Sequence, residues 1–182
     1  MRLFHFSEDP GIVRFVPRPV RIPSERPPGM DWLNGPLVWA IDEAHQPMYL
    51  FPRDCPRILL WPTPGTTEAD RALWLGDSAA RVIAHIEAPW AQTHARAVIH
   101  RHELPPAPFE DLHDAGMWIS RGAVEPLGRA TFTDLPAELA AQGAELRVVD
   151  SLEPLRAAHG SSVAFNGLRL RHMGNLPGGQ TF

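Results

Sequence analysis

The stretch TDLPAELAAQGAELRVVDSLEPLRAAHG, residues 133–160, decides the fold class. Its first part, residues 133–143, predicts a helix, because it opens on Thr and Asp as capping residues and is closed by Gly143. The apolar and β-branched run at 145–150 predicts a strand. Residues 151–160 repeat the pattern of a capped helix closed by glycine. Helices and strands therefore alternate in the last third of the chain.

The chain up to residue 127 is dominated by short apolar segments that are typical of strands. Residues 81–88, RVIAHIEA, are apolar on both faces and predict a central strand. Residues 66–76 predict a helix that follows Thr66 or Thr67 and stops at Gly76. Apolar or strand-like segments also lie at 2–7, 37–42, 48–51, 57–61, 97–104, 117–121 and 123–127. This order predicts an α+β fold with a curved antiparallel or mixed sheet and with helices mainly in the C-terminal third.

The length of 182 residues predicts a single domain over residues 1–182, with a frayed tail at 175–182. Residues 16–36 contain six prolines and three arginines and predict a long loop. Neither G-x-G-x-x-G nor a P-loop is present, which excludes the two simplest nucleotide-binding motifs.

The charge pattern points to a protein without a membrane span or a duplex nucleic-acid surface. The formal net charge is -4, and no basic stripe or 20-residue apolar run occurs. The first ten residues lack the apolar core of a signal peptide, and a lone cysteine fits a reducing cytoplasm. All 17 basic residues are arginine, which excludes a catalytic lysine and favours contacts with phosphate or carboxylate groups.

The insert PRDCPR, residues 52–57, places Arg53 and Arg57 on either side of Asp54 and Cys55. Such arginines either pair with a carboxylate and order the turn, or bind an anion. Arg121 follows a serine in MWISRGAVEPL and is a third candidate for anion binding. Cys55 is either a nucleophile with a pKa lowered by the arginines, or a buried structural residue.

Histidines suggest two further sites. His5 lies between two phenylalanines and shares a strand face with Ser7, so it is either a core residue or a polar group in a cleft. His100 and His102 share a face of another strand, with His94 upstream. These three either begin a metal site, the basis of a metal-dependent enzyme, or are exposed strand residues interleaved with Arg101.

Two glutamates are candidates for general acid–base catalysis. Glu125 sits among Val124, Pro126 and Leu127 and is expected to be partly desolvated. Glu87, in the 81–88 strand, competes with it. Each is either a structural or a catalytic residue.

LFHFS at 3–7, LVWAID at 37–42, MYLF at 48–51 and MWISRGAVEP at 117–126 resemble segments of ADP-ribosyltransferase-like proteins. The resemblance implies a split-barrel architecture and a cleft that binds NAD or a related phosphorylated nucleotide. No metal cofactor is predicted. The whole chain also resembles a bacterial family of uncharacterised proteins marked by LFHFSEDP, PRDCPR and WISR-x-x-VEPL.

The resemblance assigns roles to individual residues. It implies that His5 contacts the nicotinamide ribose with help from Ser7, and that Tyr49 stacks on nicotinamide. Glu125 would stabilise the oxocarbenium-like centre. The pyrophosphate would be held by Arg53, Arg57 or Arg121. The alternative from another class is a non-enzymatic domain that binds a ligand or a protein and has kept the fold.

Overall fold

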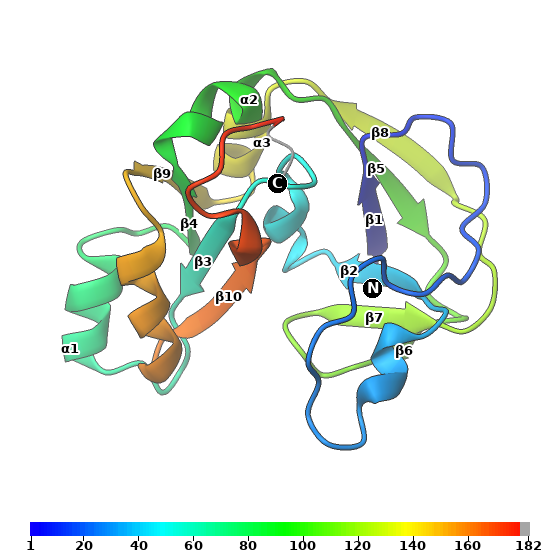
Figure 1. Ribbon diagram of the computed structural model, residues 1–182, viewed down its shortest axis with the longest axis horizontal. Helices are drawn as coiled ribbons and strands as arrows, with labels where there is room; N and C mark the ends of the chain where they lie inside the picture. The colour runs from blue at the N-terminus through cyan, green and yellow to red at the C-terminus, as the bar shows by residue number, and fades with distance from the viewer. Residues whose placement is uncertain (179–182) are drawn as a thin grey trace. The chain divides into compact units, whose positions relative to one another are not determined.

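The computed structural model describes residues 1–178, and the chain divides into two compact units. Unit 1 comprises Met1–Gln46 and His100–Thr131, and unit 2 comprises Pro47–Ile99 and the chain from Phe132 onward. Each unit contains one open sheet, and the helices of unit 2 make the fold α+β as expected (Figure 1). The expectation of a single domain over residues 1–182 stays a prediction.

Unit 1 is built on a six-stranded sheet with the order β6-β7-β2-β1-β5-β8. Neighbouring strands are antiparallel in the pairs β1–β2, β1–β5, β2–β7 and β6–β7. The elements are β1 (Leu3–Ser7), η1 (Asp31–Asn34), β2 (Val38–Asp42), β5 (Ile99–Leu104), β6 (Glu110–Asp111), β7 (Met117–Ser120) and β8 (Gly128–Phe132).

The core of unit 1 lies on the sheet face that carries Leu3 and its cross-strand partner Leu104. Phe15, from the segment after β1, packs into this core, and its backbone exchanges two 2.8 Å hydrogen bonds with Val124. Because side chains alternate along a strand, His5 and Ser7 follow Leu3 on the same face. The apolar core therefore continues directly into a row of polar side chains.

Unit 2 is built on a four-stranded mixed sheet with the order β10-β3-β4-β9, in which only β4 and β9 are parallel. Neither sheet closes into a barrel within residues 1–178. The elements are η2 (Gln46–Tyr49), β3 (Arg57–Trp61), α1 (Glu68–Asp70), η3 (Arg71–Leu75), β4 (Val82–Glu87), η4 (Ala88–Trp90), α2 (Ala91–Arg96), α3 (Leu135–Ala141), β9 (Ala144–Val149), η5 (Glu153–Gly160), β10 (Ala164–Leu168) and η6 (Leu170–His172).

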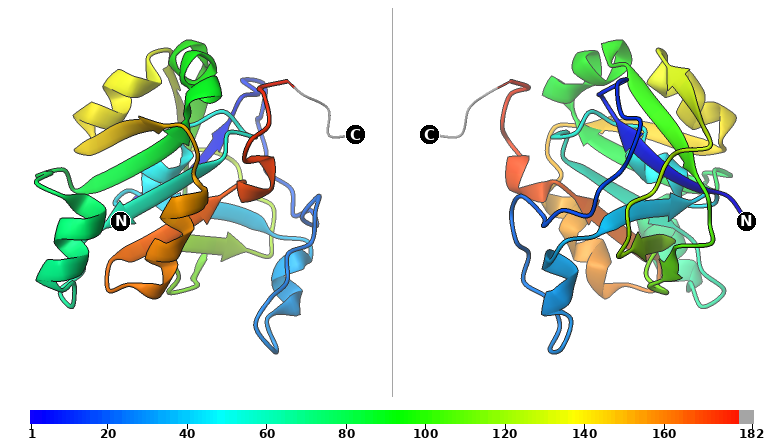
Figure 2. Two further views of the ribbon diagram at one scale, coloured as in Figure 1. Left: turned by 60° about the vertical axis from the view of Figure 1, so that its left-hand side comes forward. Right: turned by 90° about the vertical axis from the view of Figure 1, so that its right-hand side faces the viewer.

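Every residue of β4 is buried, which confirms that RVIAHIEA forms a central strand. On one face of the sheet, Ile58, Leu60 and Ile83 pack against Leu75 of η3 and Leu152 and Ala158 at η5. The two short helices α2 and α3 lie side by side, with α3 against β9 (Figure 2). None of the helices described here is long and apolar enough to cross a bilayer.

Capping residues fix the helices that the sequence predicts. The Thr67 side chain accepts a 3.2 Å hydrogen bond from the Asp70 amide, and Gly76 ends η3 with a φ of 62°. Asp134 Oδ1 accepts a 3.0 Å bond from the Ala137 amide at the start of α3. Oxygen side chains of this kind satisfy amides that have no partner within the helix.

Three local expectations are corrected or limited by the structure. Residues 123–127 form no strand and contribute one isolated bridge at Val124, whereas 128–132 form β8. The first two residues of MYLF, Met48 and Tyr49, are the end of the 3₁₀ turn η2 and not part of a strand. Helical segments occur at 68–75 and 91–96 as well as in the C-terminal third. Of the expected tail, residues 179–182 lie outside the described residues.

Candidate ligand-binding site

The PRDCPR insert forms a tight loop of unit 2 that is braced from within by Arg57, the first residue of β3. Arg57 is 4% exposed. Its Nε donates to the Met48 carbonyl (2.7 Å) and its Nη1 to the Cys55 carbonyl (3.0 Å). The guanidinium also lies 5.0 Å from the ring centre of Phe51. Arg57 thus holds backbone carbonyls, which corrects its expected pairing with a carboxylate of the loop.

Four arginines gather around this loop and are called here the arginine group: Arg53, Arg57, Arg169 and Arg171. Arg169 follows β10 with a left-handed φ of 57°, and its Nε donates to the Arg53 carbonyl (3.0 Å). Burial lowers the pKa of Arg57 to about 10, and Arg169 acts in the same direction. Burial, Arg171 and Arg53 likewise lower the pKa of Arg169, while Asp54 opposes this shift. Positive charge therefore exceeds negative charge here.

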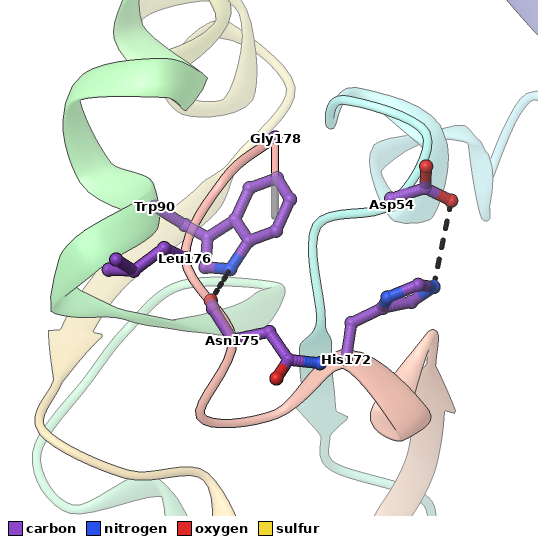
Figure 3. Close-up of a pocket in the computed structure, with 6 residues that line it drawn as sticks. All are labelled: Asp54, Trp90, His172, Asn175, Leu176 and Gly178. Atoms are coloured by element: carbon purple, nitrogen blue, oxygen red, sulfur yellow. Dashed lines mark hydrogen bonds and ion pairs between the residues drawn. The ribbon is translucent and has the colours of Figure 1, made fainter. Parts of the chain in front are cut away.

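A pocket of about 240 Å³ adjoins the loop in unit 2 (Figure 3). Asp54 and His172 stand on one side, with 3.7 Å between Oδ1 and Nε2. Trp90 stands on the other, and its indole N–H donates to the Asn175 carbonyl (3.1 Å). Leu176 and Gly178 complete the lining. The pocket thus combines a carboxylate, an imidazole and an indole beside the arginine group.

Glu87, at the end of β4, positions the segment that lines the pocket. This carboxylate is 3% exposed and accepts hydrogen bonds from the Leu152 amide (3.2 Å) and the Gly174 amide (2.7 Å). Each oxygen of this buried carboxylate therefore has a backbone hydrogen-bond partner. We assign Glu87 a positioning role, the structural one of the two alternatives that the sequence leaves open.

Cys55 is fully buried, and burial raises the pKa of its thiol to about 12 although Arg57 opposes the shift. Because the thiolate is the nucleophile, we expect native protein at pH 8 to react with iodoacetamide at least tenfold more slowly than unfolded protein. Mass spectrometry of the alkylated chain, with and without denaturant, measures the ratio. Equal labelling rates would show that the thiol is exposed and would restore the nucleophile hypothesis.

The other residues expected in a site belong to unit 1. His5 forms a 2.8 Å hydrogen bond with the Trp39 carbonyl. Ser7 is buried, and its Oγ accepts from the Asp9 amide (3.1 Å). Arg121 pairs with Glu110 (3.3 Å) and lies 4.7 Å from the Trp32 ring centre. Glu125 is exposed, which corrects the expectation of a partly desolvated carboxylate.

The predicted site residues fall into two sets. The structure brings Tyr49, Arg53 and Arg57 together in unit 2, with 5.9 Å from the Arg57 guanidinium to the tyrosine ring centre. The remaining four lie in unit 1: His5, Ser7, Arg121 and Glu125. Their catalytic and cofactor-binding roles stay predictions.

The three histidines of the metal hypothesis do not gather around one point. His94 belongs to unit 2, where Nε2 donates to the Leu50 carbonyl (3.0 Å) and the ring lies 4.8 Å from that of Phe51. His100 and His102 belong to unit 1 and are buried, which corrects the alternative that they are exposed. Within residues 1–178, no group of three His, Cys, Asp or Glu side chains is arranged to hold a metal ion.

Arg169, Arg171 and His172 were not among the residues that the sequence pattern indicated for a site. They lie in LRLRH, residues 168–172, at the end of a segment whose sequence is typical of a hairpin-like or broken strand. The sequence feature that could have indicated them is the close spacing of two arginines and a histidine just after Gly167.

Comparison with known proteins places residues 4–173 within the model of a family of unknown function, DUF6886. The chain belongs to this family. The match covers most of the chain and agrees with the expected family of uncharacterised proteins. No curated protein and no solved structure matches the chain, so the resemblance to ADP-ribosyltransferases is not confirmed.

Proposed function

We propose that unit 2 binds a small phosphate-bearing molecule at the arginine group. The observation that carries this proposal is the buried guanidinium of Arg57, which has no carboxylate partner within residues 1–178 and lies close enough to Arg169 for repulsion. A buried charge without a counter-charge is costly, and an anion relieves that cost. Guanidinium groups suit phosphate because they donate paired hydrogen bonds in one plane.

The adjoining pocket has room for the remainder of such a ligand. Asp54 offers hydrogen-bond acceptors, and the side chains of Trp90 and His172 offer flat rings. NAD, which the resemblance implies, is one molecule of this class because it carries a pyrophosphate. We keep it as a proposed ligand beside simpler phosphates.

The proposal concerns binding and not catalysis. The buried thiol of Cys55 is protonated at neutral pH and is no nucleophile. ADP-ribosyl transfer by His5, Tyr49 and Glu125 on a split barrel is a separate proposal, supported only by the sequence resemblance. Release of nicotinamide from NAD by the purified protein is the assay for it.

Arg53→Ala is expected to weaken binding of pyrophosphate about tenfold, because a charge-assisted hydrogen bond contributes roughly 1.5–3 kcal/mol. Its side chain is exposed, so the melting temperature should change little. Isothermal titration calorimetry with pyrophosphate and with NAD measures both affinities. Arg57 is unsuitable for this test because it also braces the loop.

Arg156→Ala is the matched control, since Arg156 is an exposed arginine of unit 2 that pairs with Glu153 on η5 (3.2 Å). Its affinity for pyrophosphate should equal that of the wild type. A loss of stability in Arg53→Ala without a change in affinity would assign Arg53 to the structure of the loop. If neither pyrophosphate nor NAD gives a heat of binding with the wild-type protein, the proposal is wrong.

A further inference from the structure

Unit 1 contains a row of polar side chains on the face of β1 and β5 that also carries its apolar core. In the strand register, His5 lies opposite His102, and Ser7 lies opposite His100. Directly opposed residues of antiparallel strands share a face and have neighbouring side chains. Two cross-strand pairs with three histidines thus adjoin the pair Leu3 and Leu104.

The segment 8–15 lies over this row. Phe15 places its ring 4.6 Å from that of His5 and 5.3 Å from that of His102. The Asp9 amide donates to Ser7 Oγ (3.1 Å), and the Asp9 carboxylate accepts from the Gly11 amide (2.7 Å). As a result, His102 is 1% exposed, although neither of its ring nitrogens has a hydrogen-bond partner within residues 1–178.

The charged groups near His102 disfavour a further positive charge. Arg129 of β8, whose Nη1 donates to the Pro10 carbonyl, and His100 of β5 both lower the pKa of His102, as does burial. Asp9 acts in the opposite direction on the pKa of His102, first through its backbone and then through its charge. Arg101 and Glu103 alternate with the histidines and point to the opposite face of β5.

The other two histidines of the row already have partners. His5 is bound to the Trp39 carbonyl, and His100 Nδ1 lies 2.9 Å from Thr131 Oγ1. A proton on His102 would therefore be buried beside two more imidazoles, and Asp9 is the neighbour that offsets part of this cost. The simplest relief is exposure to water, and the segment 8–15 is a cover over His102 that does not belong to the sheet.

We propose that this histidine row is a pH-sensitive latch, in which protonation of His102 releases the segment 8–15 from the face of β1 and β5. The segment closes over neutral imidazoles and opens in mild acid. Phe15 leaves the core when the latch opens, so opening exposes an apolar ring as well as the histidines. This inference does not depend on ligand binding by unit 2.

Hydrogen exchange measured by mass spectrometry tests the latch on the full chain. Between pH 6.5 and 5.5, and after correction for intrinsic exchange, amides of residues 8–15 should exchange about fivefold faster. The reason is that an exposed imidazole with an ordinary pKa is about half protonated at pH 6.5 and about nine-tenths protonated at pH 5.5. Amides of β2 and β7, in the same unit, should keep their protection. Equal protection of 8–15 at both pH values would overturn the proposal, as would parallel loss of protection throughout unit 1.

Two variants separate the latch from general acid sensitivity. His102→Phe replaces the imidazole by a ring without a titrating group and should leave residues 8–15 equally protected at both pH values. His113→Gln changes an exposed histidine of unit 1 and should behave as the wild type. If His102→Phe does not fold, the proposal is still tested by the wild-type protein, in which the exchange of residues 8–15 is compared with that of β2 and β7 at the two pH values. A response of about fivefold that persists in folded His102→Phe would show that His102 is not the trigger.

Discussion

Acidification is expected to lower the free energy of unfolding of unit 2 by about 3 kcal/mol between pH 6.5 and pH 4, because of His85. This residue lies in the buried central strand β4, opposite Ile58, and burial lowers its pKa from 6.5 to about 4. Arg147, its neighbour on β9, acts in the same direction.

The sign follows from which state takes up the proton. Below pH 6.5 the unfolded chain binds a proton at His85, while the folded chain stays neutral until the pH approaches 4. Stability therefore falls as the pH falls through this window and levels off below it. Each unit of pKa difference corresponds to about 1.4 kcal/mol.

Urea unfolding at a series of pH values measures this loss. His85→Leu removes the titrating group and should flatten the profile, although not completely, because burial also lowers the pKa of His94. His159→Gln, a change of an exposed histidine on η5, should leave the profile unchanged. A wild-type stability that is constant from pH 6.5 to 4 would show that His85 is not held neutral by burial.

Gly116→Ala is expected to destabilise the protein by about 3 kcal/mol, the sum of left-handed backbone strain and overpacking. Gly116 has a φ of 73°, and an added Cβ would lie 2.3 Å from His45 Nδ1 and 2.8 Å from Asp42 Cγ. These two side chains are fixed by a 2.8 Å contact between His45 Nδ1 and Asp42 Oδ1. The methyl group therefore has no space without breaking that pair.

Gly29→Ala is the control, because Gly29 has a φ of 82° in the same unit but open space around the position of a Cβ. It should cost only the backbone strain, about 1 kcal/mol. Urea unfolding of the two variants separates strain from overpacking. Equal losses would mean that the Asp42–His45 pair moves aside at no cost.

Local signals in the sequence predicted the parts of the fold that depend on local contacts. The helices that begin near Thr67 and Asp134 and end before Gly76 and Gly143 form as expected, since capping involves residues only a few positions apart. The buried run of β4 is also recognisable from composition alone.

Burial and charge pairing depend on contacts between residues that are far apart in the sequence, so they were harder to predict. His102 was either a metal ligand or an exposed strand residue on the sequence alone, but it is buried and the segment 8–15 contacts it. Pairing of Arg53 or Arg57 with Asp54 or another carboxylate was one of two alternatives. Arg57 instead binds carbonyls, while Asp54 faces His172 from a different part of the chain. The strand β8 was not predicted, because its sequence GRATF lacks the apolar alternation of a strand. It is a strand because it pairs with β5 at the edge of the sheet.

Each unit is assembled from two separate stretches of sequence, and this restricts how fragments are made. A cut after Gln46 removes β1 and β2 from β5 and β7, so the fragment 1–46 lacks most of its own sheet. A stop after Thr131 deprives β3 and β4 of β9 and β10 in the same way. Expression of unit 1 alone instead requires a short artificial linker in place of residues 47–99, and unit 2 alone requires one in place of 100–131.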